Sequence, residues 1–297
     1  MEKVVIYGPS KLQGEVAVSG SKNSLSAVLP AMCLMGEGAI CKVENIPDIE
    51  DVKSLCGILR ELGLQIKHNH KAKRLQVSGK IVNTYLTDKY VSKIRASSLF
   101  LGALVSACGR AHVPFCGGDN IGDRPLDIHV YVMEKFKVKV DIREGAMDCV
   151  ATEYPLKGTT IFLRYPSVGA TQNALLLAVK ATGDTYIYNA ACEPEVTDLA
   201  VALNSMGARI SGAGTNVIHV SGVKNLGDMK HELIPDRLEC ATYLLAFVMT
   251  HGKGKISGVI PEHCMALISL LKDIGVQINQ EENCLEIDAT CESYKPM

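Results

Sequence analysis

The feature that most restricts the fold of this chain is an internal repeat of about 70 residues. Four segments share one layout: an apolar helix-like run, a Gly-marked turn, a β-rich strand, a second amphipathic helix and two short strands. The second helices end at equivalent tripeptides, ELG at 61–63, KFK at 135–137, SMG at 205–207 and DIG at 273–275, whose last residues are 74, 70 and 68 positions apart. This regularity predicts one structural unit, βαβαββ, built four times.

The two helices of each unit differ in which faces are apolar. The segment at 49–63 has one apolar face and ends at Gly63, where a left-handed residue closes a helix. The first helices, by contrast, are apolar on nearly every face, as in SSLFLGALVSAC, QNALLLAVKA and ATYLLAFVMT. Helices of that kind are buried on all sides. The sequence therefore predicts an α/β (α+β) fold in which each unit places one helix inside and one at the surface.

Charge and cysteine content restrict the partners. The 297 residues carry 31 basic and 32 acidic side chains, a net charge of -1, so neither a nucleic-acid partner nor an anionic membrane surface is expected. Eleven cysteines occur without a C-x-x-C pair, so we predict no metal site and no disulfide framework. The start, MEKVVIYGPS, lacks the apolar core of a signal peptide, and the apolar stretches are too short to span a membrane. These observations predict a cytoplasmic protein.

Small or polar residues precede each predicted buried helix. The four turns read SGSKNS at 19–24, KIRASS at 93–98, PSVGAT at 166–171 and IPDRLE at 234–239. Free N–H groups and the helix dipole favour an anion at such a position, and Lys22 and Arg95 add cations. Plain N-capping explains any single turn better than ligand binding does. The set of turns together favours an anionic ligand.

The stretch PFCGGDNIGDRP at 114–125 suits neither a helix nor a strand. It is predicted to be a loop that carries Asp119 five residues ahead of Arg124. This arginine is a third cation for an anionic ligand.

Six stretches together resemble the UDP-N-acetylglucosamine enolpyruvyl transferase family. They are GPSKLQGEVAVSGSKNS at 8–24, IRASS at 94–98, GGDNIGDRPLDIH at 117–129, PSVGATQNALL at 166–176, NAACEPEVTDLA at 189–200 and IPDRLE at 234–239. The resemblance implies transfer of the enolpyruvyl group of phosphoenolpyruvate to the 3-hydroxyl of UDP-N-acetylglucosamine, with release of phosphate. It also implies a place in peptidoglycan synthesis, as its first committed step, and so in cell-wall biogenesis, cell shape and cell division.

The resemblance also implies an architecture. The family has two domains, each an inside-out barrel of three βαβαββ units, and this chain holds four of those six units. Residues 22–230 are expected to form a complete three-unit domain. Residues 1–21 and 231–297 are expected to form an incomplete second domain, with one unit and the N-terminal strands.

Site residues follow from the resemblance position by position, and it implies no cofactor and no metal. Asp119 stands where the family has its proton-donating residue, often a cysteine, and Lys22 and Arg124 complete the expected catalytic set. The expected substrate-binding residues are Lys22, Asn23, Arg95, Arg124, Pro125, Leu126, Asp127, Ile128, Ser167, Val168 and Gly169.

The chain departs from the family pattern in two places. Tyr165 stands where many members have a lysine that contacts the diphosphate. The chain also ends after its fourth unit, before the family's sugar-activating aspartate and a second arginine that closes on phosphoenolpyruvate. Two alternatives therefore stay open: a catalytically silent relative that binds a UDP-sugar or a partner, and, less favoured, a shikimate-pathway enolpyruvyl transferase. The incomplete domain is expected to self-associate or to bind a partner over 231–297.

Overall fold

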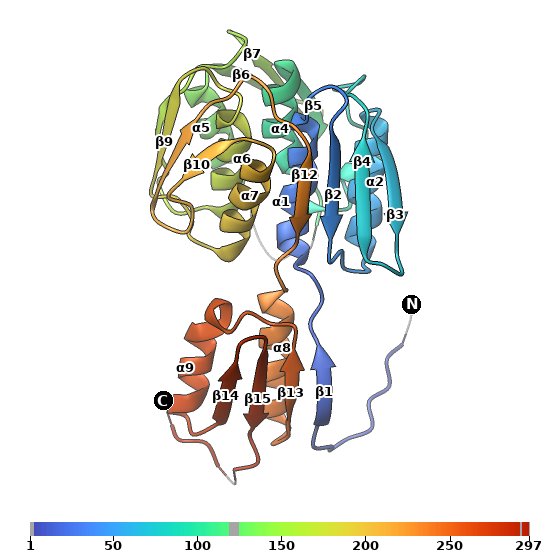
Figure 1. The fold of residues 1–297 in the computed structure, drawn as a ribbon, viewed down its shortest axis with the longest axis vertical. Helices are drawn as coiled ribbons and strands as arrows, with labels where there is room; N and C mark the ends of the chain where they lie inside the picture. The colour runs from blue at the N-terminus through green and yellow to red at the C-terminus, as the bar shows by residue number, and fades with distance from the viewer. Residues whose placement is uncertain (1–2, 119–124, 292, 297) are drawn as a thin grey trace. The chain divides into compact units, whose positions relative to one another are not determined.

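The computed structural model describes residues 3–118, 125–291 and 293–296. The chain divides into two compact units, one made of Met1–Ser21 with Ile234–Met297 and the other of Lys22–Leu233 (Figure 1). Each is built from the predicted βαβαββ repeat, so the α/β fold of repeated units is confirmed.

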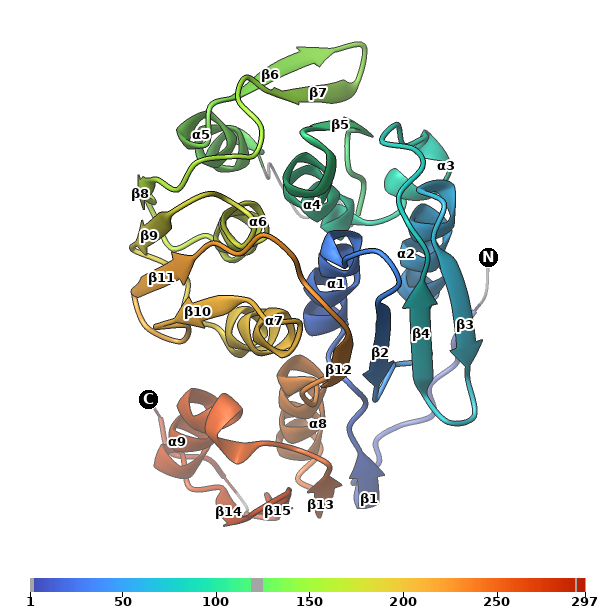
Figure 2. The ribbon, with the colours of Figure 1, turned by 45° about the horizontal axis from the view of Figure 1, so that its top comes forward.

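Three apolar helices form the centre of the larger unit. They are α1 (Lys22–Ala31), α4 (Leu99–Cys108) and α6 (Val168–Ala178), one from each repeat. Nearly all of their side chains are buried, and the strands of three sheets lie outside them (Figure 2). A helix without a polar face cannot lie at a surface without exposing apolar side chains, so its place is inside. Helix α1 contains Pro30 and passes directly into the 3-10 turn η1 (Met32–Leu34).

The second helix of each repeat is amphipathic and partly exposed. These helices are α2 (Glu50–Glu61), α5 (Asp127–Lys135) and α7 (Pro194–Ser205) in the larger unit, and α9 (Met265–Asp273) in the smaller one. The residue predicted to close each helix has a positive φ: Gly63 at 97°, Lys137 at 57°, Gly207 at 98° and Gly275 at 101°. Lys137 thus occupies the left-handed position that glycine fills in the other three repeats.

The larger unit has three sheets of related topology. The first joins β12 (Met229–Glu232), β2 (Ile40–Glu44), β4 (Arg74–Ser78) and β3 (Gln65–Asn69) in that order. The third joins β10 (Arg209–Ser211), β11 (Val217–Ser221), β9 (Asp184–Tyr188) and β8 (Thr160–Phe162). In each, one edge strand is parallel to its neighbour and the other pairs are antiparallel.

The sheet of the second repeat has three strands, and its expected first strand is reduced to a single bridge. Its sheet contains β5 (Arg110–Pro114), β7 (Ala146–Ala151) and β6 (Val138–Arg143). The place of a fourth strand is taken by one parallel bridge, between Tyr85 and His112. The chain between β4 and β5 instead forms the short helix α3 (Asp88–Val91) and the 3-10 turn η2 (Arg95–Ser98).

The smaller unit contains one repeat. Its sheet joins β1 (Gln13–Ala17), β13 (Lys253–Ser257), β15 (Cys284–Asp288) and β14 (Gln277–Glu281), with β1 parallel to β13. Helix α8 (Arg237–Met249), the 3-10 turn η3 (Pro261–Cys264) and α9 complete the unit. Its core is a separate apolar cluster that includes Leu244, Ile268 and Leu285.

The first strands of two repeats are exchanged between the units. Strand β1 precedes α1 in the chain but pairs in the smaller unit, whereas β12 precedes α8 but pairs with β2 in the larger unit. The chain therefore crosses between the units twice. The repeat pattern predicted the strands but not this exchange.

Candidate functional site

The helix N-termini of the larger unit carry the residues that the sequence singled out. Lys22 is the first residue of α1, and its Nζ lies 3.0 Å from Asp51 Oδ2 in the first turn of α2. Lys22 and Asn23 are exposed. Asp51 was not identified from the sequence, although an acid in the first turn of the following helix was a usable signal.

A buried carboxylate holds the next residue of α1. Ser24 Oγ donates a hydrogen bond to Asp198 of α7, and His231 Nε2 of β12 lies 3.0 Å from the other oxygen of Asp198. All three side chains are buried. This contact fixes the first turn of α1 and thereby the place from which Lys22 and Asn23 project.

Arg95 begins the 3-10 turn that leads into α4. It is half-buried, and its Nη1 donates to Cys116 Sγ at 3.2 Å. The two glycines after Cys116 are required by close approach of the backbone: a Cβ on Gly117 would lie 1.6 Å from Ser92 O, and Gly118 has φ +110°. The start of the predicted loop is therefore packed against the Arg95 turn.

The segment Pro125–Ile128 leads into α5. Pro125 is exposed and Leu126 half-buried, and Asp127 is the first residue of the helix. Asp127 Oδ2 accepts a hydrogen bond from Arg164 Nη2 at 2.9 Å. Ile128 is 3% exposed and belongs to the hydrophobic core, so its side chain supports the helix from inside.

The turn at Ser167 caps α6. Ser167 Oγ accepts from Ala170 N at 3.4 Å, and Val168 and Gly169 are the first two residues of the helix. Asp236 caps α8 in the same way, accepting from the backbone N–H of Leu238 and Glu239. Capping thus accounts for the polar residue of these two turns.

A buried histidine joins three of these segments. His129 of α5 is 7% exposed, and its Nδ1 lies 2.6 Å from Asn173 Nδ2 of α6. The same Nδ2 donates to Ser98 O, and Asn173 Oδ1 accepts from Gly102 N of α4. Because the amide nitrogen can only donate, His129 Nδ1 accepts and the ring is neutral with its proton on Nε2.

Electrostatics agrees with a neutral His129. Burial lowers the pKa of His129 to about 4, with a further lowering from the charge of Arg95 and an opposing effect of Asp127. On the other side of the ring lies Gly169, where an added Cβ would come within 3.1 Å of His129 Cε1. Neither His129 nor Arg164 was identified from the sequence, since a single histidine in an amphipathic helix and an exposed arginine carry no distinct pattern.

The structure therefore brings together Arg95, the start of α5 and the start of α6, with His129 and Asn173 between them. Lys22 and Asn23 lie at the start of α1, which packs against α4. Asp119 and Arg124 lie outside the described residues, so their expected places are not described. Within the described ranges, no cluster of three or more His, Cys, Asp or Glu side chains could hold a metal ion. In the same ranges, no helix combines the length and the apolar character that a membrane crossing requires.

Fold and site together define a class: an α/β protein of βαβαββ repeats whose buried helices begin at turns with cations beside them, an arrangement that favours an anion. The family model described as EPSP synthase (3-phosphoshikimate 1-carboxyvinyltransferase) matches residues 6–297. The chain belongs to this enolpyruvyl transferase family.

Curated relatives similar to this chain are named UDP-N-acetylglucosamine 1-carboxyvinyltransferase. One from Staphylococcus saprophyticus is 38% identical over 97% of this chain and 68% of its own length. One from Carboxydothermus hydrogenoformans is 41% identical over 94% of this chain and 65% of its own length. The chain thus spans about two thirds of the length of the relatives it matches.

Solved structures agree on the fold. The enolpyruvyl transferase NikO from Streptomyces tendae has a TM-score of 0.87 at 25% identity, and the match covers 98% of this chain and 69% of that one. An EPSP synthase from Acinetobacter baumannii has a TM-score of 0.71 at 18% identity, over 95% of this chain and 67% of that one. The second likeness concerns the fold alone.

Proposed function

We propose that this chain carries the nucleotide-sugar site of a UDP-N-acetylglucosamine 1-carboxyvinyltransferase and serves enolpyruvyl transfer from phosphoenolpyruvate in peptidoglycan synthesis. The names of the curated relatives support this substrate pair and do not favour the shikimate alternative. A cytoplasmic location and roles in cell-wall biogenesis, cell shape and cell division belong to the same proposal.

The observation that carries the proposal is the convergence of Arg95, Asp127 and the α6 N-terminus around His129. The diphosphate of the nucleotide would lie at the N-terminus of α6, where the Ser167 turn and the backbone N–H groups of Val168 and Gly169 favour an anion. The uridine would lie against Pro125–Ile128. In this arrangement Asp127 and the backbone of this segment supply its polar contacts.

Arg164 can replace the lysine that many family members have at the position of Tyr165. Its guanidinium lies 2.9 Å from Asp127 Oδ2, three residues before the Ser167 turn, and its side chain is 65% exposed. We propose that it supplies the diphosphate contact made by lysine in many family members. Arginine suits this role because its planar fork can bind phosphate oxygens in pairs.

The transfer needs two contributions from the chain, a proton donor and cations. Asp119 gives its proton to the methylene carbon of phosphoenolpyruvate while the sugar 3-hydroxyl adds to the neighbouring carbon and gives its own proton to a base. A proton then leaves the new methyl carbon as phosphate departs and the double bond is restored. Lys22, Arg95 and Arg124 neutralise the carboxylate and phosphate charges. Asp119 has to be protonated when the ligands are bound, and desolvation beside their negative charges favours that form.

The proposal is tested by two measurements on the purified chain. Calorimetric titration with UDP-N-acetylglucosamine is expected to show binding, which an Arg164→Gln variant weakens about tenfold. A control variant, Asp48→Asn, changes a side chain that is 88% exposed and should bind like the parent. Absence of binding by the parent chain would contradict the proposed site.

Phosphate release with both substrates tests the chemistry. If the chain turns over, Asp119→Asn should retain binding and lose release, since the amide keeps the shape but cannot deliver the proton. Undiminished release by this variant would exclude Asp119 as the proton donor. Binding without release by the parent would favour the silent UDP-sugar-binding relative.

A further inference from the structure

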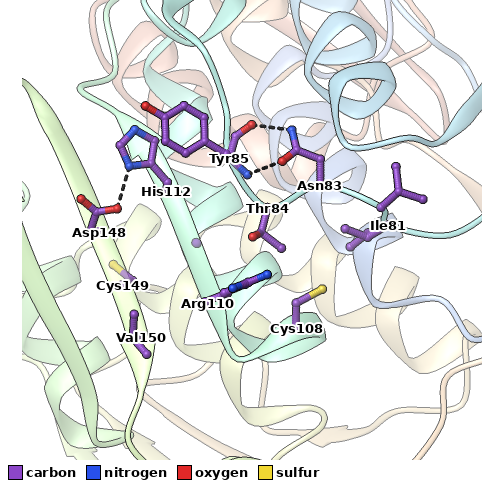
Figure 3. A pocket seen from close by; sticks show the side chains of 12 residues that line it. Ile81, Asn83, Thr84, Tyr85, Cys108, Arg110, His112, Asp148, Cys149 and Val150 are labelled. Carbon is purple, nitrogen blue, oxygen red and sulfur yellow. Dashed lines mark hydrogen bonds and ion pairs between the residues drawn. The ribbon is translucent and has the colours of Figure 1, made fainter.

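A cavity of about 560 Å³ lies at the opposite end of α4 from Arg95. Arg95 precedes the helix, whereas Cys108 ends it and Arg110 begins β5, so the two places are separated by the helix length of about 15 Å. The cavity is lined by the segment after β4 and by β5 and β7 (Figure 3). It is distinct from the candidate functional site.

One wall of this cavity is a planar, fixed surface. The rings of Tyr85 and His112 stack with centroids 3.7 Å apart and an interplanar angle of 4°. His112 Nδ1 is 2.7 Å from Asp148 Oδ1, which is visible in Figure 3. The Asn83 side chain holds Tyr85 by accepting from its N–H at 2.9 Å and donating to its carbonyl at 2.6 Å. His112 covers one face of Tyr85, while the Tyr85 residue is 57% exposed.

The other end of the cavity is positively charged. Arg110 and Lys180 both act on the Cys108 thiol and lower its pKa, although burial has the larger effect and raises it overall. Figure 3 shows the Arg110 side chain extending toward Cys108. Among the described residues, neither Arg110 nor Lys180 has an ion-pair partner. Asp148, the carboxylate that lines the cavity, is already held by His112.

Charge and shape together restrict the ligand. Arg110, at one end of the cavity, favours an anionic group of a ligand. The fixed aromatic ring of Tyr85, at the other end, favours a planar ring of the same ligand. The volume lies within the usual range of small-molecule sites, about 300–1,000 Å³. We propose that this cavity binds a small organic anion that carries a planar ring, with its carboxylate or phosphate at Arg110 and its ring on Tyr85.

Two probes test the site and its anion. Benzoate and adenosine 5′-monophosphate are titrated into the purified chain and followed by NMR of the backbone amides of β5 and β7. Saturable shifts there with at least one probe support the proposal and assign the anion as carboxylate or phosphate. Cyclohexanecarboxylate, which has the charge without the aromatic ring, should bind more weakly than benzoate. The absence of saturable shifts with both probes would overturn the proposal.

Variants separate this cavity from the candidate site. Arg110→Gln should weaken binding about tenfold or more, because it removes a charge-assisted hydrogen bond. Tyr85→Leu should also weaken it, while Arg209→Gln, an exposed arginine of another sheet, should leave it unchanged. Arg95→Gln should retain the probe. If Arg110→Gln binds like the parent, or if Arg95→Gln alone loses the probe, the cavity is not the binding site.

Discussion

His129 is held neutral by its neighbours, and this makes stability depend on pH. Its pKa is about 4 in the folded chain and about 6.5 when exposed. Above pH 6.5 His129 is neutral in both the folded and the unfolded chain, so its protonation does not lower the free energy of unfolding. Between pH 6.5 and 4 only the unfolded chain binds the proton, and the free energy of unfolding falls by about 1.4 kcal/mol per pH unit. The total loss approaches about 3 kcal/mol at pH 4. Below that pH His129 is protonated in both the folded and the unfolded chain and causes no further loss of stability.

We therefore expect the parent chain to lose about 2 kcal/mol from His129 between pH 6.5 and pH 5. His129→Gln should be less stable at pH 7, because the Asn173 contact changes, but should show a flatter dependence on pH. Urea unfolding followed by circular dichroism at both pH values measures this. His70→Gln, at a side chain that is 58% exposed, is the control and should keep the slope of the parent. Equal slopes in parent and His129→Gln would refute the assignment.

At the scale of single residues, the sequence singled out charged and polar residues at the helix starts but not the side chains that support them. Lys22, Arg95 and Ser167 were recognised because charge and capping residues at helix starts are local signals. The contact between Ser24 and Asp198 was not recognised, because it joins residues 174 positions apart. Such pairings are set by tertiary packing, which a single sequence does not reveal.

At the scale of elements, α5 and α6 approach so closely that a side chain added at Gly169 would require a neighbour to shift. A Cβ on Gly169 would lie 3.1 Å from His129 Cε1 and 3.2 Å from Nε2. We expect Gly169→Ala to lower the free energy of unfolding by about 1–3 kcal/mol, as overpacking of a filled core does. It should also weaken UDP-N-acetylglucosamine binding if the α6 N-terminus holds the diphosphate.

Denaturant unfolding of Gly169→Ala and Gly227→Ala provides the comparison. At Gly227 the nearest atom to an added Cβ is 3.8 Å away, an ordinary contact, so this variant should be close to the parent in stability. A Gly169→Ala variant as stable as Gly227→Ala would show that α5 can move away from α6 at little cost.

The elements themselves were largely predictable. Apolar runs without a polar face indicated the buried helices, and the left-handed residue predicted at Gly63 is confirmed. The repeat spacing gave the helix end at Lys137, but its left-handed backbone was not predicted. The resemblance led us to expect residues 1–21, which contain β1, in the smaller unit, but the pairing of β12 with β2 was not predicted. Strand partners far apart in the chain are chosen by the closure of each sheet, which local sequence does not reveal.

At the scale of the whole molecule, α8 differs from the other first helices. Its segment from Cys240 to Met249 is apolar in sequence, yet Leu238, Leu245 and Met249 of this helix are 50%, 43% and 81% exposed. These residues follow one another at i, i+7 and i+11 and therefore share one face of the helix. Met265 and Leu270 of the same unit are also exposed, at 44% and 43%. An apolar face of this kind is usually covered by another surface.

We predict that the purified chain self-associates through this face of α8. Sedimentation velocity over a range of concentrations should show dimers or larger species that dissociate on dilution. Leu245→Glu places a charge in the middle of the face and should shift the population toward monomer, because burying an unpaired carboxylate is costly. Lys272→Glu, at an exposed position of α9, also adds negative charge and should leave the distribution unchanged. A parent chain that sediments as a monomer at every concentration would contradict the prediction, as would an equal effect of both variants.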